Sequence, residues 1–274
     1  MARFVLTFIG FISLLTIPAV GRTYQVDGIV IEVLPAEQSM VVSHRPIVGY
    51  MAAMTMRFRV EDPAQLAGIQ PGMRVRFELV VNGTTNIARR IHREAQTETD
   101  VQIPKDRLKV GDPLPDFSLI DQSGRRVRLS DFRGRVVVVD FIYTRCPDPD
   151  MCPRLSANFA GVQKRFAAGE DAGLALLSIT IDPLHDTPGV LSEYAKLWNA
   201  DPRVWHFLTG SSQQIRSVAE KFGLIYWPED DTITHNSTTT VVNRDGKVVA
   251  IVDGSSYRLG QLNDLISTQL GDTK

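Results

Sequence analysis

The feature that most constrains this chain is a near-continuous apolar run, Arg135–Tyr143, which reads RVVVVDFIY. Such a run predicts a strand buried on both faces, as in a parallel sheet covered by helices. Apolar residues then recur at helical spacing from Leu155 to Phe166, and a second buried strand is predicted at Leu174–Ile181. This alternation of strand and helix predicts a layered α/β domain.

The remainder of this region continues the same architecture. Polar and apolar patterning predicts helices at Thr187–Trp198, Ser212–Phe222 and Leu259–Leu270, with a hairpin formed by Thr239–Asn243 and Lys247–Val252. The order strand, helix, strand, helix, hairpin and helix predicts a thioredoxin-like α/β domain over residues 111–274.

The preceding segment, residues 22–93, has the pattern of a small all-β unit. Alternating apolar and polar residues predict strands at Val26–Val33, Ser39–Ser43, Met54–Val60, Val75–Val80 and Thr85–Ile91. The dipeptide Asn82-Gly83 is a strong hairpin signal between the last two. Five short strands in one small unit predict a closed barrel of the OB type.

Length and charge agree with two domains of a globular protein. The chain has 274 residues, which corresponds to roughly two domains of about 150 residues. Its net charge of −1 argues against a nucleic-acid partner or a polybasic membrane surface. Residues 94–110 are polar, include Pro104, and are predicted to form the linker.

The first 21 residues predict export. Arg3 precedes an uncharged apolar stretch, Phe4–Val20, and small residues at Ala19 and Gly21 suit cleavage after Gly21. The alternative is an uncleaved membrane anchor formed by residues 4–20, which are near the lower length limit for a span. Either outcome places the rest of the chain in the periplasm or another exported, oxidising compartment.

Only two cysteines occur, Cys146 and Cys152, and both lie between the buried strand and the following helix. This position puts them at the carboxyl end of a sheet strand, where α/β folds carry their sites. Three interpretations remain open from the residues alone: a structural disulfide, a redox-active dithiol, or a soft-metal site. His235, in a predicted polar loop at residues 231–237, is a candidate third ligand.

Several motifs in this region resemble the Sco/SenC family. They are Gly111–Phe117 (GDPLPDF), Tyr143–Pro147 (YTRCP), Met151–Pro153 (MCP), Ile181–Pro183 (IDP) with Asp186–Pro188 (DTP), and Thr234-His235. The resemblance implies a thioredoxin-like copper protein that serves cytochrome c oxidase assembly. It implies Cys146, Cys152 and His235 as ligands for Cu(I) or Cu(II), and a role for Asp182 in shaping the surroundings. The familiar family motif has three residues between the cysteines, whereas this chain has five.

Three methionines, Met51, Met54 and Met56, lie within six positions of the barrel, and His44 ends the preceding predicted strand. Met54 and Met56 share one strand face, so filling the barrel core is one explanation. Thioethers with an imidazole also make a soft site for Cu(I). The segment from His44 to Phe58 resembles the periplasmic CusF-type copper-binding domain. That resemblance implies His44, Met54 and Met56 as ligands, with Met51 at the position of the family's capping tryptophan.

These observations together predict an exported metallochaperone rather than an enzyme. It would capture Cu(I) in the barrel and deliver it, through Cys146, Cys152 and His235, to the copper-bearing subunit of cytochrome c oxidase. Copper binding needs both thiols reduced, so a thiol reductant of the same compartment is an expected partner. Two alternatives remain: a thiol–disulfide oxidoreductase whose redox-active pair is Cys146 and Cys152, and copper sequestration.

Overall fold

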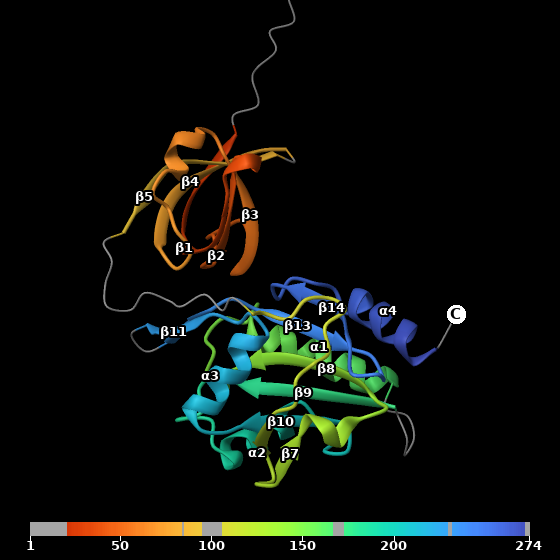
Figure 1. Ribbon diagram of the computed structural model, residues 1–274. Helices are drawn as coiled ribbons and strands as arrows, with labels where there is room; N and C mark the ends of the chain where they lie inside the picture. The colour runs from red at the N-terminus through yellow and green to blue at the C-terminus, as the bar shows by residue number, and fades with distance from the viewer. Residues whose placement is uncertain (1–20, 84, 95–105, 167–172, 230–231, 272–274) are drawn as a thin grey trace, which may run out of the picture.

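The computed structural model describes residues 21–83, 85–94, 106–166, 173–229 and 232–271. A small β-barrel and a larger α/β domain account for these residues (Figure 1). The predicted export segment, apart from Gly21, and residues 95–105 of the predicted linker lie outside the described residues. Among the helices that are described, none is both long enough and apolar enough to cross a membrane.

The barrel is closed by five strands in the order β1-β2-β3-β5-β4. Their bounds are β1 Arg22–Leu34, β2 Ser39–His44, β3 Met54–Val60, β4 Arg74–Asn82 and β5 Thr85–Arg93. Two short 3₁₀ helices, η1 (Pro35–Glu37) and η2 (Pro63–Leu66), follow β1 and β3. Only the β3–β5 pairing is parallel, and it closes the barrel.

The barrel strands alternate as their sequences predict. On β3, Phe58 and Val60 are buried, whereas Arg57 and Arg59, which alternate with them, are exposed. Phe58 packs edge-on against Phe77 of β4, with ring centroids 5.0 Å apart. Alternation of this kind places one face of each strand in a shared apolar interior.

The larger domain contains a seven-stranded sheet in the order β14-β13-β8-β9-β10-β6-β7. The bounds are β6 Ser118–Asp121, β7 Arg126–Arg128, β8 Val136–Ile142, β9 Leu174–Thr180, β10 Trp205–Thr209, β13 Thr238–Val242 and β14 Val248–Asp253. Strands β8, β9 and β10 are parallel to one another, and every residue of all three is buried. This confirms the sequence-based prediction of two-face burial for β8 and β9.

Four α-helices cover the sheet, together with a short 3₁₀ helix, η3 (Leu129–Phe132). The helices are α1 (Cys152–Phe166), α2 (Pro188–Leu197), α3 (Ser212–Lys221) and α4 (Leu259–Leu270). Helices α1 and α4 contact each other and β8, while α2 contacts β10. Thr187 and Ser211 cap α2 and α3 by accepting backbone N–H bonds, so both helices begin where the sequence places capping residues.

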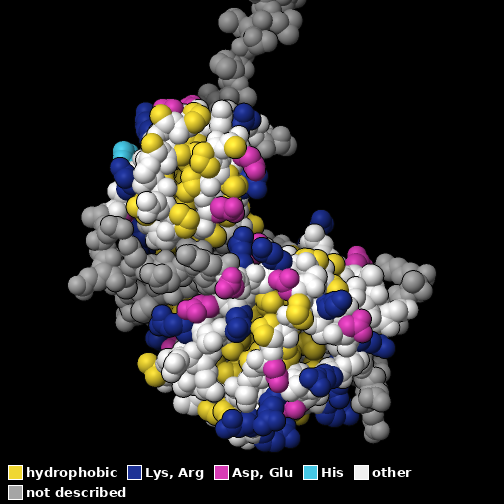
Figure 2. Space-filling view, in the orientation of Figure 1, with side chains coloured by type: hydrophobic (Ala, Val, Ile, Leu, Met, Phe, Trp, Pro, Cys, Tyr) yellow, Lys and Arg dark blue, Asp and Glu magenta, His cyan; other side chains and the backbone are white. Residues whose placement is uncertain are grey.

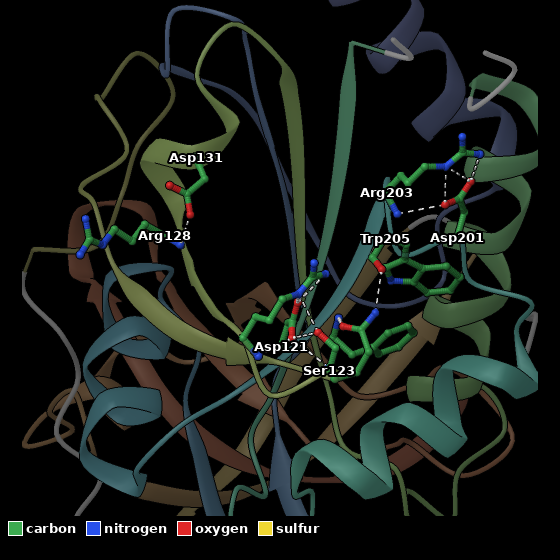
Figure 3. Close-up of polar contacts among 10 residues, drawn as sticks. Asp121, Ser123, Arg128, Asp131, Asp201, Arg203 and Trp205 are labelled. Carbon is green, nitrogen blue, oxygen red and sulfur yellow. Dashed lines mark hydrogen bonds and ion pairs between the residues drawn. The ribbon is translucent and has the colours of Figure 1, made fainter. Parts of the chain in front are cut away.

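Strand β10 was not predicted, because its sequence is short and carries the polar His206 as its second residue. It is held between β9 and β6 and, at one edge, by Gln122. The Gln122 side chain donates to the carbonyl of Trp205 and accepts from the N–H of Phe207. Figure 3 shows this edge, where Asp121 accepts hydrogen bonds from Ser123 and its neighbours. Tertiary pairing therefore defines this strand.

Candidate copper centres

The two cysteines lie at the carboxyl edge of the parallel strands. Cys152 is the first residue of α1 and is fully buried, while Cys146 lies in the loop after β8 and is half-buried. The backbone N–H of Tyr143, just beyond β8, donates to Cys152 Sγ at 3.4 Å. Neither cysteine forms a disulfide in this structure. The strand end and the helix start thus bring the two sulfurs to one place.

Two buried aspartates hold the chain segment that leads into Cys146. The Asp186 carboxylate accepts from the Thr144 hydroxyl and the Thr180 hydroxyl, each at 2.5 Å, and from the Thr144 N–H at 3.1 Å. Asp182 Oδ2 lies 2.6 Å from Arg145 Nε. Thr144 and Arg145 are the residues directly before Cys146, so both carboxylates act on the shape of the cysteine loop.

The surroundings of the two cysteines drive their pKa values in opposite directions. The neighbouring Cys152 thiol is the largest cause that lowers the pKa of Cys146, to about 4, and the nearby His235 imidazole acts in the same direction against the effect of burial. Complete burial and the neighbouring Cys146 charge raise the pKa of Cys152. The pair therefore holds one thiolate, on Cys146, and one proton, on Cys152.

His235 ends strand β12 (Thr232–His235), which pairs with β11 (Tyr226–Glu229). The prediction of a polar loop here was wrong, because Tyr226 pairs with His235 in a short antiparallel ladder. The ring of His235 is buried, lies edge-on to Tyr143 at 5.7 Å, and donates from Nδ1 to the Asn236 carbonyl at 2.6 Å. That bond leaves the Nε2 lone pair free to bind a metal.

The barrel residues His44, Met54 and Met56 come together through strand register. His44 of β2 lies directly opposite Met54 of β3, and Val42 lies opposite Met56. His44 and Met54 therefore share one face, with Met56 diagonally across from His44. The His44 ring is buried, donates from Nδ1 to the Arg45 carbonyl at 2.7 Å, and has no hydrogen-bond partner at Nε2.

The methionine side chains differ from the core residues that follow them on β3. Phe58 is fully buried, whereas Met54 and Met56 are only half-buried. Met51 is also half-buried and is joined to Ile47 by an isolated β-bridge. The three methionines are therefore less enclosed than the core residue Phe58, although Met51 and Met56 still pack against the barrel core.

The donor sets of both regions suit copper. Thioether and imidazole groups bind Cu(I) without losing a proton, and thiolates with imidazole hold either copper oxidation state. Among the described residues, no three His, Cys, Asp or Glu side chains converge as a ready-made metal cage. Tyr143 instead joins the two sides of the centre, because its N–H donates to Cys152 Sγ and its ring lies edge-on to His235.

Comparison with known families decides the affiliation of the chain. The family model described as SCO1/SenC matches residues 106–268, more than half of the sequence. The chain belongs to the SCO1/SenC family. The model described as the copper-binding periplasmic protein CusF matches residues 23–93, which cover the barrel. Copper is therefore the metal that these matches support.

Similar proteins and solved structures agree with this affiliation. A SCO2-like protein of Rickettsia typhi is 33% identical over 156 residues, covering 54% of this chain and 72% of that protein. A SCO1 homologue of Bacillus subtilis is 32% identical over 157 residues, covering 53% and 78%. The structure of a SCO1/SenC family lipoprotein from Bacillus anthracis matches with a TM-score of 0.52 at 26% identity, covering 58% of this chain and 95% of the other.

Two further structures bear on the larger domain. BsSco, a Sco-family cytochrome c oxidase assembly protein with a disulfide switch, matches with a TM-score of 0.51 at 29% identity, covering 61% of this chain and 98% of its own. Copper-bound ScoI of Arabidopsis thaliana matches with a TM-score of 0.50 at 25% identity, covering 60% and 100%. The larger domain thus has the thioredoxin-like fold of Sco proteins.

Three residues near the centres were not identified as functional from the sequence. Asp186 was noted only within a motif, yet it fixes the cysteine loop. Asn236 holds the His235 ring through its carbonyl. Asp140, at the middle of the buried strand β8, contributes to the raised pKa of Cys152. A charged residue inside an otherwise apolar run was the only sequence signal for any of them.

Proposed function

We propose that this chain is an exported metallochaperone that captures Cu(I) in its barrel and delivers it through Cys146, Cys152 and His235 to the copper centre of cytochrome c oxidase. The observation that carries the proposal is the placement of both cysteines and the buried His235 ring around Tyr143, whose N–H donates to Cys152 Sγ at 3.4 Å and whose ring lies 5.7 Å from that of His235. The barrel, with the strand order β1-β2-β3-β5-β4, is assigned to the OB type. His44, Met54 and Met56 are assigned as its copper ligands.

Delivery by such a centre is an exchange of ligands, with no change in oxidation state. Cu(I) binds the Cys146 thiolate and the His235 nitrogen, and Cys152 adds a second thiolate when it releases its proton to solvent. Because thiolates are softer and stronger donors than thioethers, copper is expected to favour the cysteine centre over the barrel. An acceptor with more thiolates or a better-shaped site would then remove it.

The test is the copper stoichiometry of the purified, reduced protein, measured without oxygen. We expect two equivalents of Cu(I) for the natural chain. Cys146→Ser should remove the equivalent with thiolate-to-copper absorption, and Met54→Leu combined with Met56→Leu should remove the other. A chain that binds no copper, or whose bound copper is unaffected by these changes, would contradict the proposal.

A second function, thiol–disulfide exchange, is supported by the opposite pKa shifts of the two cysteines. The Cys146 thiolate would attack a disulfide of the oxidase copper site, forming a mixed disulfide and releasing one partner thiolate. Cys152, on losing its proton, would displace the second partner thiolate and close a Cys146–Cys152 disulfide. A thiol reductant would restore the pair. Rapid reduction of a disulfide peptide by the copper-free protein, lost in Cys146→Ser, would favour this function.

A further inference from the structure

The barrel and the larger domain touch, and residues of both candidate copper centres lie at the contact. Thr55, between Met54 and Met56 on β3, accepts a hydrogen bond at 3.3 Å from the side-chain amide of Asn236. The backbone carbonyl of the same Asn236 accepts from the His235 ring. Asn236 therefore bonds both to His235 of the cysteine centre and to Thr55, which lies between Met54 and Met56 of the barrel centre.

Met54 itself rests on the larger domain. A Cβ atom added to Gly254, which follows β14, would lie 3.2 Å from Met54 Cβ and 3.3 Å from its Cε. Gly254 has φ of 82°, a conformation that glycine adopts without strain, and its N–H donates to the carbonyl of Ser237. Met51 and Met56 pack against the barrel core, whereas Met54 does not.

The loops that border the two centres also face each other. Residues 46–52 of the barrel and the cysteine loop line one cavity of about 400 Å³. Met51 lies on the barrel side, and Asp148 and Asp150, both between the two cysteines, lie on the other. Of the candidate copper ligands, Met51 lines this cavity, and the cysteine loop forms part of its opposite wall.

A separate apolar contact holds the domains together. Ile29 and Ile31 of β1, with Val41 of β2, pack against Ile225 of the larger domain in a cluster distinct from both domain cores. Ile29, Ile31 and Ile225 are all at least nine-tenths buried. Figure 1 shows the lower ends of the barrel strands facing the top of the larger domain, and Figure 2 shows an open notch between the two domains on one side.

We propose that the barrel loads the cysteine centre of its own chain while the domains are docked, by a ligand exchange in which Met54 is the barrel ligand at the boundary. This inference rests on the proposed function, because it needs both centres to bind copper. Cu(I) stays Cu(I) throughout, and each thioether or imidazole bond that breaks is replaced by a bond to Cys146, Cys152 or His235. The proton of Cys152 leaves to solvent as its sulfur binds.

The experiment follows the loading of the reduced full chain by Cu(I) supplied from a coloured chelator complex, without oxygen. Loss of the chelator colour measures total uptake, and thiolate-to-copper absorption measures loading of the cysteine centre. Ile31→Glu disrupts the apolar contact outside both centres, and Thr55→Val removes the bond to Asn236 while keeping the side-chain shape. Thr85→Val, at an exposed threonine of β5, is the matched control.

We expect the natural chain to load its cysteine centre about tenfold faster than Met54→Leu with Met56→Leu, since a docked donor acts at a high effective concentration. Ile31→Glu should fill its barrel normally yet load the cysteines at the slow rate, Thr55→Val should be intermediate, and Thr85→Val should match the natural chain. Equal loading rates in the natural chain and in Ile31→Glu or Thr55→Val would overturn the inference, as would a natural transfer rate proportional to chain concentration. Absence of copper from either centre of the natural chain at equilibrium would instead refute the proposed function.

Discussion

At the scale of single residues, two histidines from different domains are prepared in the same way. His44 and His235 each donate from Nδ1 to the carbonyl of the residue that follows, Arg45 or Asn236, at 2.7 and 2.6 Å. Because a carbonyl can only accept, each bond fixes the tautomer that leaves the Nε2 lone pair free. Both rings are buried, so their orientation is set before any metal arrives.

Replacing either histidine should therefore weaken one copper centre and spare the other. His44→Ala should lower the Cu(I) affinity of the barrel, and His235→Ala that of the cysteine centre. Each loss should be about 100-fold or more, since even residues behind the ligands contribute about 10–100-fold. Competition with a Cu(I) chelator measures both affinities. Loss of both centres in one variant would show that the two histidines serve a single site.

A third residue, Asp140, makes the stability of the copper-free protein depend on pH. It is fully buried in β8, neither carboxylate oxygen has a hydrogen-bond partner within the usual distance, and burial raises its pKa from 3.8 to about 7, only partly opposed by Ser178. The folded state thus holds the proton more tightly than the unfolded state. The stability that this proton supplies is complete below about pH 4 and is lost as the pH rises to about 7.

Asp140→Asn should remove this loss. At about 1.4 kcal/mol for each pH unit, the natural chain loses roughly 2–3 kcal/mol between pH 5 and pH 8 from this group. The variant should therefore gain most over the natural chain at pH 8, as measured by guanidinium unfolding of the reduced, copper-free protein. Burial lowers the pKa of His44 and His206, so these two residues make the folded state more stable as the pH rises. The natural chain and Asp140→Asn share this effect, and it cancels when their stabilities are compared. An advantage of the variant that is the same at both pH values would refute this account.

At the scale of elements, the cysteine loop depends on the buried carboxylate of Asp186. Asp186→Asn replaces one accepting oxygen by a donor, facing the hydroxyls of Thr144 and Thr180. Stability should fall by about 1–3 kcal/mol, and the Cu(I) affinity of the cysteine centre should weaken several-fold. Unfolding and chelator competition measure the two effects.

Asp121→Asn is the matched control for that change. Asp121 is equally buried and accepts from the Ser123 hydroxyl and from two backbone N–H groups, but it is the last residue of β6 (Figure 3). We expect a comparable loss of stability with no change in copper affinity. If both variants lose copper affinity equally, Asp186 acts through general stability and not through the loop.

The same elements show what could be predicted from the sequence. Local patterns were sufficient for the barrel strands, for β8 and β9, and for the helices, because each has a clear period of apolar residues. They were insufficient for β10, whose partner β9 is distant in the sequence, and for β12, the strand that carries His235, which pairs with the nearby β11. The contact of Asp186 with Thr144 joins residues 42 positions apart, and those of Asn236 with Ile225 and Thr55 join residues 11 and 181 positions apart.

At the scale of the whole molecule, Ile225 links the stabilities of the two domains. Its side chain packs with Ile29 and Ile31 of the barrel and belongs to neither domain core, whereas the adjacent Leu224 belongs to the core of the larger domain. Truncating Ile225 should therefore weaken docking and leave both cores intact, while truncating Leu224 should destabilise the larger domain directly, by about 2–5 kcal/mol.

Thermal unfolding can separate these effects, because all three tryptophans, Trp198, Trp205 and Trp227, lie in the larger domain. Tryptophan fluorescence then follows that domain alone, and circular dichroism follows both. In Ile225→Ala, the barrel should melt several degrees earlier by circular dichroism, because it loses the apolar contact that docking supplies, while the fluorescence midpoint stays close to the natural value. In Leu224→Ala the fluorescence midpoint should fall. The fluorescence midpoint could instead fall as far in Ile225→Ala as in Leu224→Ala. That result would place Ile225 in the core of the larger domain and would show that the apolar contact does not hold the domains together.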